Sequence, residues 1–188
     1  MNTPNKLTVL RILLIPVFLV FLMIDSIPHH FLWALILFAV ASLTDLVDGK
    51  LARRYNMVTD FGKFLDPLAD KMLVTSALIC FVELGLTPSV AVVVIVFREF
   101  LVTSLRLVAS GSGKVVAANI WGKLKTTVQM SGIVGILFFS ELQYAGVIPA
   151  SFDLHPWFDG VMWLAAALTL ASGATYVWEN RKFINTTK

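Results

Sequence analysis

The sequence is poor in charge and in cysteine, and each shortage excludes a class of protein. Only 14% of the 188 residues are charged, whereas a soluble domain of this size carries about 25%. The hydrophobic share is 57% and the mean hydropathy is +0.81, so the composition suits a lipid bilayer as solvent. The single cysteine, Cys80, cannot form an intrachain disulfide. Because the net charge is only +3 and no Lys/Arg-rich tail is present, we expect no nucleic-acid partner.

Six apolar segments are each long enough to cross a membrane as a helix. A spanning helix needs roughly 20 mostly apolar residues, because about 30 Å of hydrocarbon is crossed at about 1.5 Å per residue. The sequence therefore predicts an all-α, polytopic membrane protein with one domain over residues 1–188 and a short interfacial lead-in over residues 1–6. The predicted transmembrane helices cover residues 7–25, 30–54, 61–84, 88–110, 119–141 and 157–180.

The first segment has an alternative interpretation as a signal peptide. Lys6 and Arg11 precede an apolar run, as in such peptides. The residues that follow the run, 25–30, contain no obvious small-x-small cleavage site. A retained first transmembrane helix therefore fits better.

Positive charges are concentrated on one side of the predicted spans. The turns near residues 25–30, 84–88 and 142–156 contain no Lys or Arg. The other turns and both ends of the chain are basic, and the positive-inside rule places that side in the cytoplasm. We therefore expect a multi-pass protein of the cell membrane with both termini cytoplasmic. His29 and His30 then fall on the outer side, where we expect a solvated turn rather than a metal site.

Four aspartates lie at the cytoplasmic ends of the second and third predicted helices. The pair Asp45 and Asp48 is spaced i, i+3, and the pair Asp66 and Asp70 is spaced i, i+4. Each spacing puts both carboxylates on one helix face. Unpaired carboxylates at membrane depth would each cost several kcal/mol and would repel one another. Hard divalent cations (Mg²⁺, Mn²⁺ or Ca²⁺) remove that cost, and no Cys/His set competes for zinc.

The pattern thus predicts a centre of two divalent cations, for which we favour Mg²⁺ or Mn²⁺. Such centres stabilise the attacking and leaving oxygens in phosphoryl transfer. Gly49 and Gly62 leave room for a nucleotide or phosphate beside the backbone, Arg53 offers a planar fork of donors, and Thr59 adds a hydroxyl. The alternative is that the aspartates form helix caps and salt bridges with neighbouring basic residues, which we favour only for Asp60.

The spacing of these residues resembles the signature of the CDP-alcohol phosphotransferases. Eight residues match D-x2-D-G-x2-A-R-x8-G-x3-D-x3-D over 26 positions without a gap: Asp45, Asp48, Gly49, Ala52, Arg53, Gly62, Asp66 and Asp70. The six predicted spans agree with the family as well. The resemblance implies that a CDP-linked lipid or alcohol donates a phosphoryl-alcohol unit to an acceptor hydroxyl, and that CMP leaves.

The resemblance also implies a role for each matching position. Asp45, Asp48 and Asp66 are similar to metal ligands. Asp70 is similar to the general base and is expected to touch metal as well. Five residues are similar to positions that contact the CDP-lipid: Asn5, Thr8, Gly49, Arg53 and Thr59. Family likeness further implies a homodimer.

Three stretches resemble the branch that transfers a phosphatidyl group from CDP-diacylglycerol to sn-glycerol 3-phosphate. They are residues 1–11, 97–106 and 122–126. An anionic acceptor calls for cations near the site, and we expect them among Arg98, Arg106, Lys114, Lys123 and Lys125. The lysines have an alternative role as cytoplasmic anchors, and Arg98 could instead form a buried pair with Glu99 or with the aspartates.

Two other functions remain open at this point. A sibling enzyme could use inositol phosphate, serine, a choline-type alcohol or phosphatidylglycerol as the acceptor, and inositol phosphate would need the same cations. A transporter could use intramembrane carboxylates as a proton or ion pathway. No polar chain extends from the aspartates towards the outer side, so the transporter is the weaker alternative.

Overall fold

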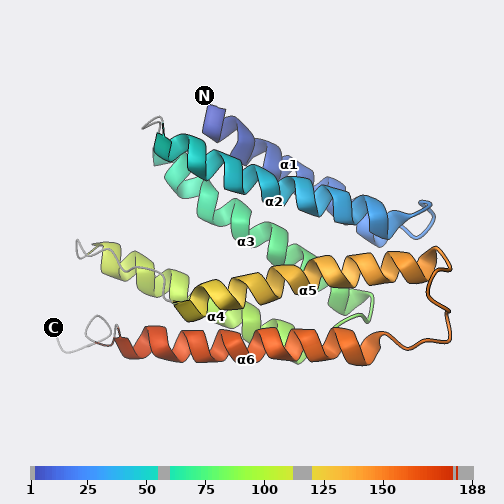
Figure 1. Cartoon of the computed structure of the whole chain (residues 1–188). Helices are drawn as coiled ribbons and strands as arrows, with labels where there is room; N and C mark the ends of the chain where they lie inside the picture. Colours follow the sequence, from blue (N-terminus) through green and yellow to red (C-terminus); the bar gives the residue numbers. More distant parts are fainter. Residues whose placement is uncertain (1–2, 55–59, 112–119, 180, 182–188) are drawn as a thin grey trace. The chain divides into compact units, whose positions relative to one another are not determined.

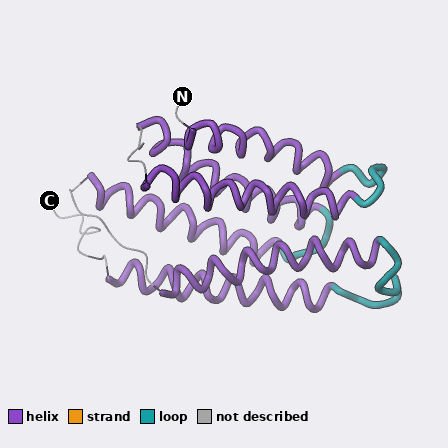
Figure 2. Tube along the Cα trace, turned by 45° about the horizontal axis from the view of Figure 1, so that its top comes forward, coloured by secondary structure: helices purple, strands orange, loops and turns teal. Residues whose placement is uncertain are grey.

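The computed structural model describes residues 3–54, 60–111, 120–179 and 181, and all regular structure in these ranges is helical (Figures 1 and 2). The helices are α1 (Thr3–Met23), α2 (His30–Arg54), α3 (Asp60–Glu83), α4 (Ser89–Gly111), α5 (Ile120–Tyr144) and α6 (His155–Glu179). Each begins and ends within a few residues of a predicted segment, so the all-α prediction is confirmed.

The N-terminal lead-in is not a separate element. Residues 3–6 form the first turn of α1 and continue directly into the apolar part of the helix. Pro4 does not interrupt this turn, because the first N–H groups of a helix have no intrahelical partner to lose. The helical backbone therefore starts at Thr3, before the onset of the apolar residues that set the predicted boundary.

The chain divides into two compact units. The first consists of Met1–Leu84 with Ile133–Asp153, and the second of Gly85–Gly132 with Leu154–Lys188. Within the first unit α1 packs against α2 and α3, which also contact each other, and Figure 1 shows α1 lying along α2. Within the second unit α4 packs against α6.

One face of α1 is buried along most of its length. Its buried residues recur with alternating spacings of three and four and are Thr8, Arg11, Ile15, Phe18 and Leu22. The Phe18 ring packs against Phe38 of α2 with centroids 5.9 Å apart, and the Phe21 ring packs against Trp33 at 6.0 Å. Because residue numbers rise along α1 as those of the partners fall along α2, the two helices are antiparallel.

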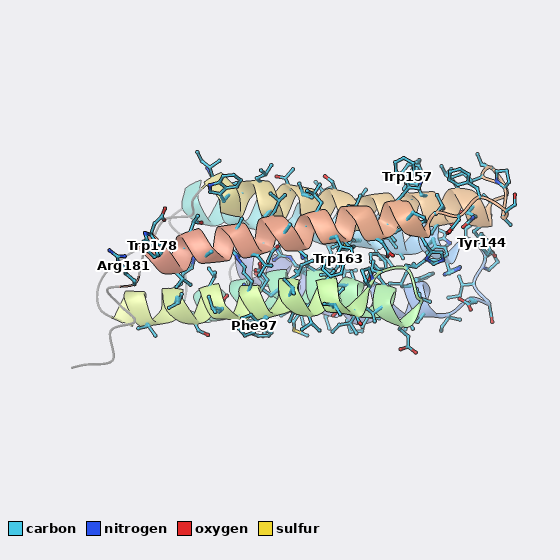
Figure 3. All side chains as sticks on the ribbon, turned by 90° about the horizontal axis from the view of Figure 1, so that it is seen from below. Phe97, Tyr144, Trp157, Trp163, Trp178 and Arg181 are labelled. Carbon is cyan, nitrogen blue, oxygen red and sulfur yellow. The ribbon has the colours of Figure 1, made fainter. Side chains whose placement is uncertain are left out.

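Large apolar side chains are exposed on all six helices of the described structure. Examples are Leu13 of α1, Ile79 of α3, Phe97 of α4 and Leu164 of α6, and Figure 3 shows Phe97 at the edge of its helix. A soluble monomer rarely exposes so much contiguous apolar surface. The exposed faces therefore suit contact with lipid.

Two helices in the described ranges are long and apolar enough to cross a membrane by length and composition alone, Lys6–Met23 and His155–Glu179. A third, shorter apolar stretch covers His30–Thr44 of α2. In the sequence, the first charged residue of α2 is Asp45, which directly follows Thr44. The charged residues of the site thus shorten the apolar run without ending the helix.

The turn between α1 and α2 is fastened to the end of α5 within the first unit. Glu141 accepts a hydrogen bond from the backbone N–H of Leu32 (3.1 Å) and pairs with His29 Nδ1 (2.5 Å). His30 is only 4% exposed and its ring meets Tyr144 edge-on, with centroids 5.4 Å apart. The expectation of a solvated turn is therefore wrong for His30, because a distant helix covers it.

Candidate active site

The four aspartates lie on the two helices that flank residues 55–59. Asp48 is six residues before the end of α2, and Asp66 is six residues after the start of α3. The two helices contact each other, and in Figure 1 the end of α2 lies beside the start of α3 and close to the start of α1. The backbone therefore brings Asp45 and Asp48 to the same end of the first unit as Asp66 and Asp70. The aspartate side chains lie outside the described residues, so their roles as ligands and base remain predictions.

A buried polar layer on α1 faces this end of α2. Thr8 and Arg11 are each 1% exposed. Arg11 Nε donates a long hydrogen bond to Thr44 Oγ1 (3.5 Å), and Thr44 in turn donates to the carbonyl of Ala41 (2.6 Å). Thr44 directly precedes Asp45, so the guanidinium of Arg11 is buried beside the aspartate-bearing part of α2. A buried guanidinium requires acceptors and a counter-charge nearby.

The donor set fits hard divalent cations. Carboxylate oxygens are the ligands that Mg²⁺ and Mn²⁺ prefer, and the buried layer on α1 shows that this end of the bundle already accommodates polar groups. Among the side chains that the structure describes, no group of three or more His, Cys, Asp or Glu could hold a metal ion. The aspartate cluster therefore remains the candidate metal centre.

A second charged cluster lies in the second unit. Arg98 is 9% exposed, and its Nη1 donates to Glu99 Oε1 (3.1 Å) while its Nη2 donates to Ser172 Oγ (2.6 Å). Lys125 is 4% exposed and pairs with the same Glu99 oxygen. Two of the cations expected to bind acceptor phosphate are thus brought together by one carboxylate. The pair between Arg98 and Glu99, which the sequence offers as an alternative, is present.

The other expected cations are distributed more widely. Arg106 is exposed, with its guanidinium carbon 5.6 Å from the centroid of the Tyr176 ring. Lys123 is exposed near the start of α5. Lys114 and Thr59 lie outside the described residues. Asn5, Gly49 and Arg53 lie on α1 and α2, but the side chains of Asn5 and Arg53 and the surroundings of Gly49 are outside the described part of the structure. Of the predicted contacts to the CDP-lipid, Thr8 alone has a described side chain, and it is buried.

Comparison with known proteins assigns the family. Residues 1–171 match the CDP-alcohol phosphatidyltransferases. The chain belongs to this family. The match covers α1 to most of α6, so it includes both charged clusters, and membership makes the chain a transferase.

Family members from several bacteria are similar over nearly the full length. A protein of Bacillus subtilis named CDP-diacylglycerol–glycerol-3-phosphate 3-phosphatidyltransferase is 43% identical, with 98% of each chain covered. A Rickettsia bellii protein of the same name is 37% identical, with 97% of each chain covered. A probable phosphatidylglycerophosphate synthase of Mycobacterium tuberculosis is 44% identical over 94% of this chain and 80% of its own.

Sequence reasoning missed three residues that the structure places beside the charged clusters of this family member. Arg11 belongs to the stretch 1–11 and to the basic side of the predicted topology, but the sequence analysis assigns it no place at the site. Its spacing from Thr8, Ile15 and Phe18 is that of a buried helix face and could have revealed it. Ser172 and Gly173 carry no such signal, because serine and glycine are common in transmembrane helices. Their proximity to Arg98 appears only in three dimensions.

Proposed function

We propose that this protein transfers the phosphatidyl group of CDP-diacylglycerol to sn-glycerol 3-phosphate, giving phosphatidylglycerophosphate and CMP. The observation that carries the proposal is the similarity to the Bacillus subtilis protein, 43% identical over 98% of both chains. The buried cations Arg98 and Lys125 support an anionic acceptor, since a phosphate group favours charge-assisted hydrogen bonds. Phosphatidylglycerol biosynthesis follows as the process served.

The proposed setting is the cell membrane, crossed by six helices with both termini and the active site on the cytoplasmic side. The six helices are 21 to 25 residues long, enough to cross about 30 Å of hydrocarbon. Exposed Trp157 and Trp178 lie near opposite ends of α6 (Figure 3). Their separation along the helix corresponds to about 30 Å, which suits two membrane interfaces. Arg181 lies over the Trp178 ring at 4.8 Å, as expected for the basic side.

Two divalent cations, Mg²⁺ or Mn²⁺, are proposed to be held by Asp45, Asp48, Asp66 and Asp70. When bound, they would neutralise charge on the pyrophosphate of the donor. The same four carboxylates would otherwise repel one another at a buried end of the bundle. A homodimer, implied by family likeness, is part of the proposal.

The chemistry proposed for the chain's own residues is a single displacement at phosphorus. Asp70 accepts the proton of the acceptor hydroxyl as that oxygen attacks the β-phosphorus of CDP-diacylglycerol. A phosphorus–oxygen bond forms to the acceptor, the bond to the bridging oxygen breaks, and CMP leaves with that electron pair. Because an aspartate is a weak base at neutral pH, positioning and charge stabilisation supply much of the rate enhancement.

Other residues are proposed to bind the two substrates. Arg53 neutralises charge on the pyrophosphate through its fork of donors. The remaining contacts to the CDP-lipid come from Asn5, Thr8, Gly49 and Thr59. The acceptor phosphate is bound by cations drawn from Arg98, Arg106, Lys114, Lys123 and Lys125.

The assay that tests the proposal measures CMP release from CDP-diacylglycerol by the purified protein with different acceptors. We expect turnover with sn-glycerol 3-phosphate, a product with the mass of phosphatidylglycerophosphate, and loss of turnover on chelation that Mg²⁺ or Mn²⁺ restores. Turnover with inositol phosphate equal to or above that with glycerol 3-phosphate would show that the acceptor is wrong. Serine and phosphatidylglycerol serve as further acceptors in the same series.

A further inference from the structure

The buried face of α6 is apolar in its N-terminal half and polar in its C-terminal half. Thr169, Ser172 and Tyr176 are at most 2% exposed, and Gly173 is buried among them. These residues recur at i, i+3, i+4 and i+7 and therefore form one stripe. Both arginines of α4 contact the stripe, Arg98 at Ser172 and Arg106 at Tyr176. None of the residues proposed to bind substrate or metal lies on α6.

Arg98 fits against α6 at a position where any side chain would interfere. A Cβ atom added to Gly173 would lie 3.0 Å from Arg98 Cγ and 3.8 Å from its Nε. The stem of the arginine therefore runs directly over the backbone of α6. Ser172, the preceding residue, accepts the hydrogen bond from Nη2 (2.6 Å). Ser172 and Gly173 together form a seat that fixes both the stem and the head of Arg98.

The seat leaves the Nε–H donor of Arg98 available. Nη1 and Nη2 are satisfied by Glu99 and Ser172, whereas the buried Nε has no hydrogen-bond partner among the described residues. Buried donors are normally paired, so an unpaired one calls for an explanation. An anion reaching Arg98 would supply the missing acceptor.

Glu99 extends the seat to a second cation. Its Oε1 accepts from Arg98 and pairs with Lys125 of α5, so two positive charges and one negative charge share a small buried volume. Counted by formal charge, the two cations and one carboxylate sum to about +1. Such a cluster attracts an anion while its cations are already held in place.

We propose that Ser172 and Gly173 are positioning residues for acceptor recognition, because they hold Arg98 in place to bind the phosphate of the acceptor. This inference rests on the proposed function, in which Arg98 is one of the acceptor-binding cations. An arginine that is free in the unbound enzyme loses rotamer freedom when it binds an anion, so fixing it beforehand strengthens binding. Through Ser172 and Gly173, α6 would therefore contribute to selectivity for an acceptor that carries phosphate.

The test compares Ser172→Ala and Gly173→Ala with two control variants in the purified full-length protein. Gly160→Ala is the control for Gly173, because it lies on the same helix with no atom within 4 Å of the added Cβ. Ser104→Ala is the control for Ser172, because Ser104 is exposed on α4. Initial rates of CMP release give kcat and the KM for each substrate, and thermal unfolding reports the folded state.

We expect each seat variant to raise the KM for sn-glycerol 3-phosphate about tenfold, equivalent to about 1.4 kcal/mol. The KM for CDP-diacylglycerol and the values for both control variants should stay within about twofold of wild type. The preference for glycerol 3-phosphate over glycerol, which lacks the phosphate, should fall by the same factor. A structural role alone would lower kcat or the unfolding temperature without this selective change.

Different failures have different signatures. If wild type uses glycerol 3-phosphate but Ser172→Ala leaves its KM unchanged, the seat has no role in recognition and the inference is overturned. A fall in kcat with unchanged acceptor KM overturns it as well. If wild type does not use glycerol 3-phosphate, the proposed function itself is wrong. Should Gly173→Ala fail to fold, Ser172→Ala decides alone, since it removes only one oxygen atom.

Discussion

At the scale of single residues, Arg11 shows how a charge can be buried in an apolar bundle. Its side chain lies on the buried face of α1, between Thr8 and Ile15, and contacts the residue that precedes Asp45. Arginine side chains carry a positive charge in proteins. The charge of Arg11 must therefore be balanced, and Asp45 directly follows Thr44, the residue that Arg11 Nε contacts. We infer that Arg11 stabilises the aspartate cluster electrostatically.

The first prediction follows from that inference. Arg11→Met should lower the free energy of unfolding by about 3 kcal/mol in chelator, because the carboxylates lose a buried counter-charge. The loss should be smaller with saturating Mg²⁺, since bound cations replace part of the missing charge. Thermal unfolding of the purified protein with and without Mg²⁺ measures both values.

Lys6→Met is the matched control, since Lys6 is exposed on the same helix. It should change the unfolding temperature little in either condition. An equal loss for Arg11→Met with and without Mg²⁺ would mean that Arg11 acts through packing and not through charge.

The second prediction concerns Asp70 as the base that accepts the proton of the acceptor hydroxyl. Asp70→Asn should reduce kcat at least about a hundredfold, because a general base contributes typically 10²- to 10⁴-fold and an amide cannot accept the proton. Asp60→Asn, at the start of the same helix, should retain most activity. CMP release measures both, with thermal unfolding as the check on folding. Substantial residual activity of folded Asp70→Asn would exclude the base role.

The sequence predicts the role of a residue when that role depends on neighbours along the same helix. It does not predict contacts with residues far away in the chain. The aspartates were found because their roles depend on spacing along α2 and α3, which the sequence contains. The partners of Arg98 and the cover over His30 come from residues far away in the chain, Ser172 and Tyr144. Sequence spacing within one helix cannot reveal such contacts, since they depend on how different helices pack.

At the scale of helices, the lengths of the apolar runs in the sequence predicted well where each helix begins and ends. Each of the six helices begins and ends within a few residues of its predicted segment, because turns such as that at Pro88 end apolar runs that fill a helix. The exceptions are informative: α1 starts before its apolar run, and α2 continues beyond Thr44, where its apolar run ends. In both cases the extra helical turns lie at the end that carries the candidate active site.

The third prediction tests a close contact between α5 and α6 in the second unit. A Cβ atom on Gly132 would lie 2.8 Å from both Met162 Cε and Val161 Cγ1. Gly132→Ala should therefore destabilise the protein by about 1–3 kcal/mol through overpacking, despite the better helix propensity of alanine. Small residues of this kind allow membrane helices to approach closely.

Gly135→Ala on the same helix is the control, because nothing lies within 4 Å of its added Cβ. It should leave stability unchanged or raise it by up to about 1 kcal/mol, the helix-propensity difference between glycine and alanine. Thermal unfolding of the two variants under identical detergent conditions gives the comparison. A stable Gly132→Ala would show that the flexible end of Met162 and the Val161 side chain move aside at little cost.

At the scale of the whole molecule, the proposed topology is what would allow the two substrates to meet. In that topology, a lipid donor would reach the aspartate end of the first unit from the bilayer, and a water-soluble acceptor would come from the cytosol. Both routes require the turns after α2 and after α4 to lie on the cytoplasmic side. Large apolar side chains are exposed on all six helices, which supports burial of the helices in lipid.

The last prediction separates six spans from two, the number of helices among the described residues that pass by length and composition alone. Since Cys80 is the only cysteine, Cys80→Ala gives a background for single-cysteine variants at Ser151, Ser112 and Lys188. A membrane-impermeant maleimide should label Ser151→Cys in intact cells, and the other two only after the membrane is opened. With only α1 and α6 spanning, Ser112 would lie between them on the outer side and would be labelled in intact cells. Labelling at Ser112 therefore decides between the two topologies, and with them whether the acceptor can arrive from the cytosol.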